Sequence, residues 1–275
     1  MNTVTSKDGT TIVYDQTGQG PPLILVSGAF GYRKFPGAVK LAGLLSERFT
    51  VYNYDRRGRG DSGDAKSYAI EREIEDLDAV IAAAGGSAYV WGLSSGAALA
   101  LHAAASGSAI SKLALHEPPF IVGAADRKPP KDFLRHLRQL IADDRRGDAV
   151  RYFLTTGMGA PSFVVGMMRI MPGVWRKLTA VAHTLPYDAA LLEGYMDGRP
   201  LPTDQWTGVA MPTLVLAGAE SPESMRRGAE ATAAALPHAA LVCRKGLGHM
   251  KQLPAEATAA ELKAFFAPAQ PKERN

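Results

Sequence analysis

The chain has 275 residues, of which 46% are hydrophobic, and its formal net charge at pH 7 is +4. This length and composition predict one large domain, or one domain with an inserted cap, around a sizeable core. The charge is mild and no dense Lys/Arg run occurs, so a nucleic-acid partner is not expected. No apolar stretch could span a bilayer, and residues 1–7 lack the apolar part of a secretion signal. We therefore expect a soluble, cytoplasmic protein with no membrane partner.

The only cysteine, Cys243, excludes a disulfide within the chain. Its apolar neighbours at 239–242 predict a buried, unreactive thiol. No spacing of His, Cys, Asp or Glu indicates a metal site, and no G-x-G-x-x-G motif follows the early strand. The sequence therefore predicts no metal and no dinucleotide cofactor.

The first hundred residues alternate between strand and helix patterns. They begin with a hairpin around the turn dipeptide Asp8-Gly9. An apolar run at 22–26 suits a strand that is buried on both faces of a sheet. The segments that follow are a helix near 37–47, a strand at 50–54, a polar loop at 55–63, an acid-rich helix near 69–84 and a strand at 87–92.

The alternation continues after the middle of the chain. A strand at 110–116 is ended by two prolines, and later segments are a strand at 213–217, a helix near 223–235, a strand at 240–243 and a helix near 256–266. Alternating strands and helices predict an α/β fold with a mostly parallel sheet and helices on both faces.

Residues 119–205 interrupt this rhythm with helical stretches, many prolines and no clear strand. We interpret them as an inserted helical cap over the carboxyl ends of the strands, and residues 1–118 and 206–275 as the core. Within 127–180 there are 11 Lys/Arg and 4 Asp/Glu. A solvated helix face explains this excess better than attraction of anionic substrates.

The most informative motif is Gly92-Leu93-Ser94-Ser95-Gly96, which follows an apolar strand and precedes a helical stretch at 97–105. A serine on such a tight turn holds its hydroxyl clear of the backbone, at the positive end of the helix. The flanking glycines are needed because a Cβ atom would clash across the turn. The motif therefore predicts that Ser94 is a nucleophile.

The motif, the alternation, the inserted segment and the late Gly246-Leu247-Gly248-His249 resemble the α/β-hydrolase family. The resemblance covers nearly the whole chain. It implies an eight-stranded sheet, a Ser/acid/His triad and an oxyanion hole made by two backbone N–H groups. It also implies that His249, in a Gly-rich loop after the last strand, is the general base.

The acid departs from the usual family pattern, in which an aspartate follows the strand that here is 213–217. Ser221 stands at that position, and a serine cannot stabilise an imidazolium as a carboxylate does. Glu117, at the end of the strand beside the nucleophile strand, is the preferred candidate. Glu220 and Glu223 stay open as alternatives. Residues 90–97 and 116–118 also resemble the zearalenone lactonase branch, where a glutamate occupies the place of Glu117.

The oxyanion hole and the substrate pocket are less sharply defined. Ser95 is expected to give one N–H donor, and either Gly28 or Ala29 the other. For the apolar side chains of 158–175, ordinary core packing is the favoured interpretation, although adaptable Met and aromatic side chains also suit a bulky apolar substrate. The residues proposed to bind substrate are Phe30, Trp175, His183 and Met158. Among the other histidines, we expect His102 to be a packing residue, His116 to support Glu117, and His136 and His238 to lie on the surface.

These features together predict a serine hydrolase that cleaves a carboxylic ester or lactone through an acyl-enzyme, without a cofactor. The partner is then a small-molecule ester or lactone, and a homodimer is left open. Other reactions of the same fold, by a thioesterase, perhydrolase or C–C hydrolase, remain alternatives, as does a non-catalytic ligand-binding protein.

Overall fold

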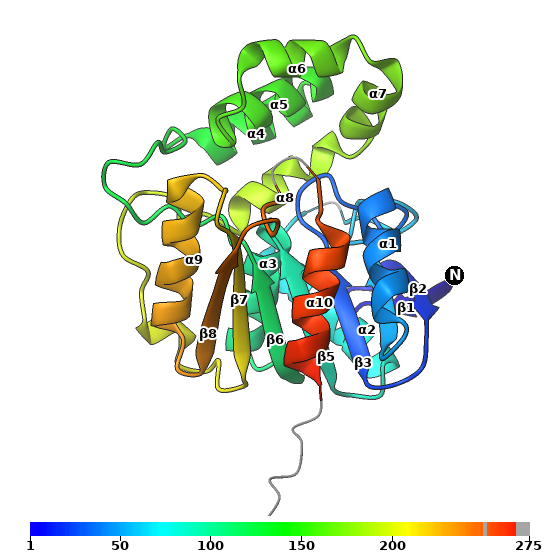
Figure 1. Cartoon of the computed structure of the whole chain (residues 1–275). Helices are drawn as coiled ribbons and strands as arrows, with labels where there is room; N and C mark the ends of the chain where they lie inside the picture. The colour runs from blue at the N-terminus through cyan, green and yellow to red at the C-terminus, as the bar shows by residue number, and fades with distance from the viewer. Residues whose placement is uncertain (66, 250–251, 268–275) are drawn as a thin grey trace, which may run out of the picture.

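The computed structural model describes residues 1–65, 67–249 and 252–267, and over these residues the chain forms an eight-stranded sheet (Figure 1). The spatial order is β1-β2-β4-β3-β5-β6-β7-β8. The strands are β1 (Asn2–Thr5), β2 (Thr11–Thr17), β3 (Pro22–Val26), β4 (Thr50–Tyr54), β5 (Ala88–Leu93), β6 (Ile110–His116), β7 (Thr213–Gly218) and β8 (Ala239–Arg244).

The sheet is antiparallel at one edge and parallel elsewhere. β1 pairs antiparallel with β2, and β2 with β4, whereas the pairs from β4 through β8 are parallel. The chain passes from β3 to β4 on one side and later to β5 on the other. Loops that leave β3 and β5 therefore meet at the carboxyl ends of adjacent strands, where ligands bind in open α/β sheets.

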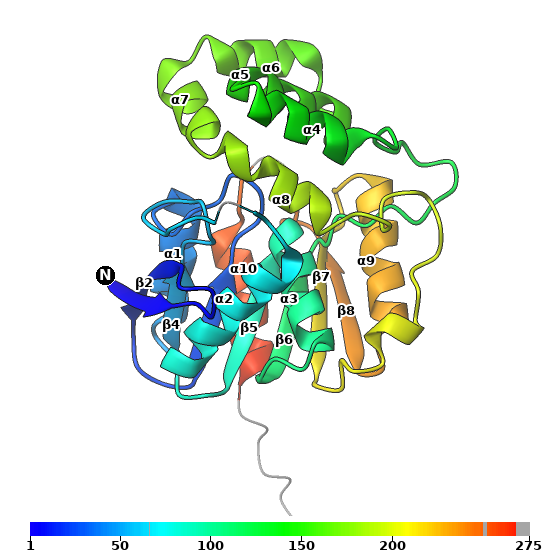
Figure 2. The same ribbon diagram turned by 180° about the vertical axis from the view of Figure 1, so that it is seen from behind.

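Helices cover both faces of the sheet, as the sequence predicted (Figures 1 and 2). One face carries α1 (Pro36–Leu45) and α10 (Ala255–Phe266), and the other carries α2 (Ile70–Ala83), α3 (Ser95–Ala105) and α9 (Glu223–Ala235). Alternation along β6 explains the two cores. Leu113 and Leu115 belong to the cluster that contains α3, whereas Ala114 belongs to the cluster that contains α10.

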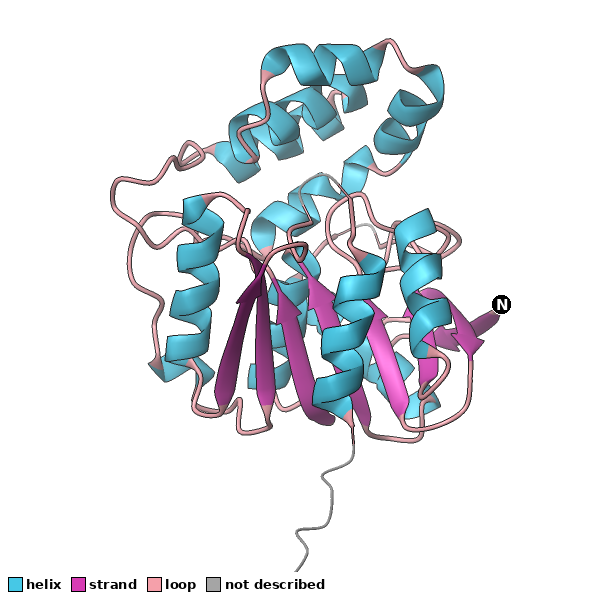
Figure 3. Cartoon of the chain, in the orientation of Figure 1, coloured by secondary structure: helices cyan, strands magenta, loops and turns pink. Residues whose placement is uncertain are grey.

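Residues 119–205 form helices above the carboxyl ends of the strands (Figure 3). The helices of this segment are α4 (Phe133–Ala142), α5 (Arg146–Tyr152), α6 (Ser162–Arg169), α7 (Pro172–Ala180) and α8 (Leu185–Ala190), with a π-helical turn at Phe153–Gly157 and 3₁₀ turns at Ala182–Thr184 and Asp204–Trp206. The segment has its own apolar cluster, which includes Leu137, Val150 and Leu185. The limits 119–205 for a separate cap stay a prediction.

Two expectations about burial were wrong. Cys243 is exposed rather than buried, because β8 is an edge strand of the sheet and is only partly covered by other elements. The apolar side chains of α6 and α7 are largely surface rather than core. Phe163 is 71% exposed and Met167 is 59% exposed. These two helices form the outer layer of the segment, so each has one side that no other element covers (Figure 1).

In the described part of the chain, no helix is both long and apolar enough to cross a membrane. Across the same residues, no three His, Cys, Asp or Glu side chains converge closely enough to hold a metal ion.

The turn between β5 and α3 is predicted to tolerate no side chain at Gly96. A Cβ atom there would lie 2.3 Å from the carbonyl oxygen of Val26, a backbone atom that cannot move aside. We expect Gly96→Ala to lower the free energy of unfolding by roughly 3 kcal/mol, measured by urea denaturation.

Gly43→Ala is the matched control, because Gly43 lies within α1 and a Cβ atom there would meet nothing within 4 Å. That variant should be more stable by about 0.5–1 kcal/mol, since alanine loses less backbone entropy on folding. Equal midpoints for Gly96→Ala and the wild type would contradict the predicted clash.

Candidate active site

Ser94 occupies a strained turn between β5 and α3. Its backbone has φ 54° and ψ −124°, a conformation that costs a non-glycine residue about 1–3 kcal/mol. Backbone hydrogen bonds hold the turn: the Ser94 N–H donates to the His116 carbonyl at 2.9 Å, and the Ala97 N–H donates to the Ser94 carbonyl at 2.9 Å. The side chain is half-buried at the positive end of α3. This geometry matches the turn expected from the sequence.

Glu117 is a fully buried carboxylate whose two oxygens are both occupied. It follows β6 and has φ 47°. One oxygen, Oε1, accepts hydrogen bonds from the Gly218 N–H at 2.9 Å and the Ser221 hydroxyl at 2.5 Å. The other, Oε2, accepts a hydrogen bond from the backbone N–H of His249 at 3.0 Å and also contacts the ring nitrogen Nδ1 of His249. The structure therefore brings together Glu117 and His249, which are 132 residues apart in the sequence.

The environment keeps Glu117 ionised. Burial alone would raise the pKa of this carboxyl, but the hydrogen bonds from His249, Ser221 and the Gly218 N–H outweigh it and lower the pKa to about 2. An anion at Nδ1 requires the proton of the neutral imidazole to sit on that nitrogen. His249 Nε2 is then left as the basic nitrogen.

The two alternative acids lie elsewhere. Glu220 is exposed and accepts the Gly246 N–H at 3.1 Å. Glu223 is exposed and pairs with Arg227 on the next turn of α9. Among the contacts of the described residues, His249 meets the carboxylate of Glu117 and not those of Glu220 or Glu223. Ser221 stands where the family usually has its catalytic aspartate, and the sequence assigned it no role. In the structure its hydroxyl donates a hydrogen bond to Glu117.

The proposed oxyanion donors lie on both sides of the Ser94 turn. Ser95 is the first residue of α3, so its N–H has no acceptor within the helix. Gly28 follows β3 and lies against the turn, because a Cβ atom on it would lie 2.7 Å from the Leu93 carbonyl oxygen and 3.0 Å from Ser94 Cβ. Ala29 is the next residue, and the choice between Gly28 and Ala29 as second donor stays open.

A sequence profile described as the alpha/beta hydrolase family matches residues 23–263. The chain belongs to the alpha/beta hydrolase family. Its structure is similar to that of an alpha/beta hydrolase from Sphaerobacter thermophilus, with 47% sequence identity, a TM-score of 0.87 and coverage of 97% of this chain and 100% of that one.

The present chain also shares its fold with more distant proteins. One is an enol-lactonase from Burkholderia xenovorans, with 21% identity, a TM-score of 0.64 and coverage of 96% of this chain and 99% of that chain. Another is an esterase from Rhodococcus, with 21% identity, a TM-score of 0.62 and coverage of 96% of this chain and 97% of that chain. At these identities the likeness shows the fold alone.

Of the residues expected to bind substrate, Met158, Trp175 and His183 lie in the helical segment, whereas Phe30 lies in the loop after β3. Phe30 packs edge-on against Phe153, with ring centroids 5.6 Å apart, and so links the loop after β3 to the helices. His183 Nε2 lies 3.6 Å from Asp64 Oδ2. Met158 is 41% exposed. Contact of Phe30, His183 and Met158 with substrate stays a prediction.

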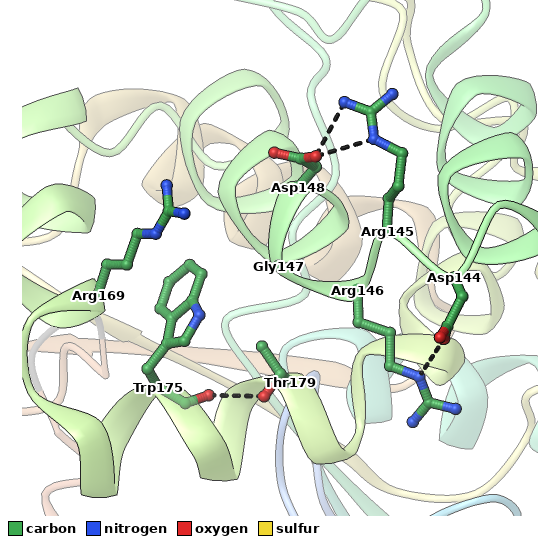
Figure 4. A pocket seen from close by; sticks show the side chains of 8 residues that line it. All are labelled: Asp144, Arg145, Arg146, Gly147, Asp148, Arg169, Trp175 and Thr179. Atoms are coloured by element: carbon green, nitrogen blue, oxygen red, sulfur yellow. Dashed lines mark hydrogen bonds and ion pairs between the residues drawn. The ribbon is translucent and has the colours of Figure 1, made fainter.

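Trp175 lines a different cavity. This cavity has a volume of about 450 Å³, and its lining residues come from α5, the two residues before it, α6 and α7 (Figure 4). They are Asp144, Arg145, Arg146, Gly147, Asp148, Arg169, Trp175 and Thr179. Since none of Ser94, Glu117 and His249 is among them, this cavity is not the candidate active site.

The other histidines lie largely as expected. His102 packs beside Tyr195 and Trp206, and its Nε2 lies 3.1 Å from the Leu191 carbonyl oxygen. His136 and His238 are exposed.

His116 supports the loop that carries His249. It is fully buried, and its Nε2–H donates to the Leu247 carbonyl at 2.7 Å, because a carbonyl oxygen can only accept. Its ring centroid lies 6.0 Å from that of His249. Burial is the main reason that the pKa of His116 is lowered to about 4, and the nearby His249 adds to the effect. His116 is therefore neutral at pH 7.

This buried imidazole should make stability depend on acidity. The pKa of His116 is about 4 in the folded chain, against an ordinary value of 6.5. Below pH 6.5 the unfolded chain binds a proton at this histidine and the folded chain does not. The free energy of unfolding therefore falls as the pH is lowered from 6.5 to 4. We expect the free energy of unfolding of the wild type to fall over this window by about 3 kcal/mol more than that of His116→Gln.

The measurement is urea denaturation at several pH values. The quantity compared between variants is the change in the free energy of unfolding with pH, not its absolute value. His238→Gln is the control, because His238 is exposed. Its pH profile should follow that of the wild type. If His116→Gln also follows the wild type, His116 is not held neutral by its surroundings.

Proposed function

We propose that this hydrolase cleaves carboxylic esters or lactones by a serine mechanism with Ser94, His249 and Glu117 as the triad. The observation that carries the proposal is the buried, ionised Glu117 on His249 Nδ1, in a chain whose Ser94 occupies a strained turn at a helix N-terminus. These are the parts that acyl transfer to a serine requires.

The proposed reaction has two halves. Ser94 Oγ attacks the carbonyl carbon while His249 Nε2 takes the hydroxyl proton, and Glu117 stabilises the imidazolium that forms. The N–H of Ser95, with that of Gly28 or Ala29, donates to the oxyanion of the tetrahedral intermediate. His249 then protonates the departing alkoxide. A water molecule, activated by the same histidine, releases the acid from Ser94.

The proposed substrate is bulky and apolar. Phe30 bridges the loop near Ser94 and the helical segment, so an acyl or alcohol group that reaches past it would meet apolar side chains. We propose that Phe30, Met158 and His183 contribute to substrate choice, through binding energy gained away from the reacting carbonyl. Hydrolysis of a thioester or of a C–C bond instead of an ester would revise the substrate class but keep the triad.

Removal of the nucleophile should abolish turnover. We expect Ser94→Ala to lower kcat for p-nitrophenyl acetate by about 10⁴ to 10⁶-fold, because no other group can form the acyl-enzyme. Its melting temperature should stay close to that of the wild type, since alanine adopts the same turn with no new contact. A purified Ser94→Ala enzyme with near wild-type kcat would rule out the serine mechanism.

The acid should be Glu117 and not a carboxylate after β7. Glu117→Gln keeps the side-chain size but removes the charge, so we expect kcat to fall by about 10⁴-fold. The amide group cannot accept from all of its present donors, so some stability should be lost as well. Rates are therefore compared per folded molecule, with the folded fraction taken from circular dichroism, well below the melting temperature.

Glu220→Gln and Glu223→Gln are the matched controls, because both carboxylates are exposed and lie away from His249. Both variants should retain wild-type kcat. An active Glu117→Gln together with an inactive Glu220→Gln would move the acid to the loop after β7.

A further inference from the structure

A second buried carboxylate, Asp188, joins the helical segment to the core. It lies on α8, which packs against α3, and its side chain is fully buried. Arg59 donates to both of its oxygens at 2.9 and 2.8 Å, and Arg56 Nη1 donates to Oδ1 at 2.9 Å. Burial would raise the pKa of Asp188, but these two guanidinium groups outweigh it and keep the pKa below its ordinary value.

The cluster of Asp188, Arg56 and Arg59 forms hydrogen bonds with both backbone segments that are proposed to form the oxyanion hole. On the α3 side, the Ser95 hydroxyl donates to Asp188 Oδ1 at 2.7 Å. On the β3 side, Arg59 Nη1 donates to the Gly28 carbonyl at 2.6 Å, and Arg56 Nη1 donates to the Ser27 carbonyl at 3.2 Å. A path of hydrogen bonds therefore connects Ser95 to Gly28 through Asp188 and Arg59, and both of these side chains are buried.

The geometry of this path matters for the backbone N–H groups beside it. The carbonyl of Gly28 and the N–H of Ala29 belong to one planar peptide unit, so a hydrogen bond that fixes the first also fixes the direction of the second. The hydroxyl of Ser95 similarly fixes the residue whose own N–H opens α3. Donors in an oxyanion hole act through preorganisation, and their spacing is what the transition state senses.

We propose that Asp188 and Arg59 are positioning residues that set the spacing and direction of the two oxyanion donors, and that α8 thereby controls the rate of the chemical step. This inference rests on the proposed serine mechanism. It assigns to the helical segment a part in the chemistry itself, in addition to any part in substrate choice.

The neighbouring pair Arg57–Asp76 separates this role from a merely structural one. It is also a buried ion pair formed by an arginine of the same loop, with two hydrogen bonds of 2.7 Å. Its other partners are Asp8 and the Arg72 carbonyl, away from Ser95 and Gly28. Loss of Asp188 removes the carboxylate that Arg59 contacts, and loss of Asp76 leaves Arg57 with Asp8 alone, so both losses should lower stability.

The test compares Asp188→Asn, Ser95→Ala and Asp76→Asn with the wild type, using p-nitrophenyl acetate and a fluorophosphonate titration of active sites. Ser95→Ala removes only the hydroxyl and keeps the backbone N–H, so it carries the test if Asp188→Asn does not fold. A second measurement is the inhibition constant of phenylboronic acid, whose adduct with Ser94 carries a tetrahedral anionic centre like that of the transition state.

We expect kcat per active site to fall about 100-fold in Asp188→Asn and about tenfold in Ser95→Ala, with KM changed less than about twofold. Binding of phenylboronic acid should weaken in step with kcat. The two effects should not add in the double variant, because both act through one path. Asp76→Asn should melt at a lower temperature yet keep its kcat and its affinity for the boronic acid.

If turnover depends on Ser94 but Asp188→Asn and Ser95→Ala keep the wild-type kcat, the positioning role is wrong and the triad stands. An equal loss of kcat in Asp76→Asn would also overturn it, because the effect would then reflect general loosening. If the wild type shows no turnover that depends on Ser94, the proposed function fails and this inference fails with it.

Discussion

The candidate site depends on the hydrogen bonds of one buried carboxylate, that of Glu117. A fully buried anion is unfavourable unless every lone pair finds a donor, and here the donors come from separate parts of the chain. They are the Gly218 N–H at the end of β7, the Ser221 hydroxyl beyond it, and the main chain and ring of His249. One charge thus fixes the loop after β7 and the loop after β8 relative to the end of β6.

The order of the strands explains why these parts can meet. β5 pairs with β6, β6 with β7 and β7 with β8, all in parallel, so their carboxyl ends lie along one edge. Ser94, Glu117 and His249 each follow one of the strands β5, β6 and β8. The register adds a direct link, because the Ser94 N–H donates to the His116 carbonyl just before Glu117. Any slip between β5 and β6 would separate Ser94 from the acid.

The sequence was most informative where one short-range rule decides the structure. The apolar runs of the strands and the glycine pair at 92 and 96 each carry their own signal, and both are found as expected. Burial was harder to predict, because it depends on what lies above a residue. Cys243 is in an apolar strand, yet that strand is at the edge, and Phe163 is on an apolar helix with no layer outside it. Neither fact is encoded near the residue itself.

Long-range polar pairing was the other feature that the sequence could not show. Asp188 is separated from Ser95 by 93 residues and from Arg59 by 129, and nothing in its neighbourhood marks it as a buried anion. The only signal was indirect. Three arginines at 56, 57 and 59 follow a buried strand, and arginines in such a place need carboxylate partners. The sequence offers many carboxylates and gives no means to choose among them.

The serine at the usual acid position has a physical explanation. The loops after β7 and β8 approach closely: a Cβ atom on Gly218 would lie 2.4 Å from the Gly248 nitrogen, and one on Gly248 would lie 2.6 Å from Ser221 Oγ. An aspartate at 221 would place a second anion beside Glu117, and two adjacent carboxylates cannot both stay ionised. A serine is small enough for this space and can donate a hydrogen bond. Ser221 is therefore a residue type that suits this position beside the buried Glu117: its hydroxyl keeps Glu117 charged instead of competing with it.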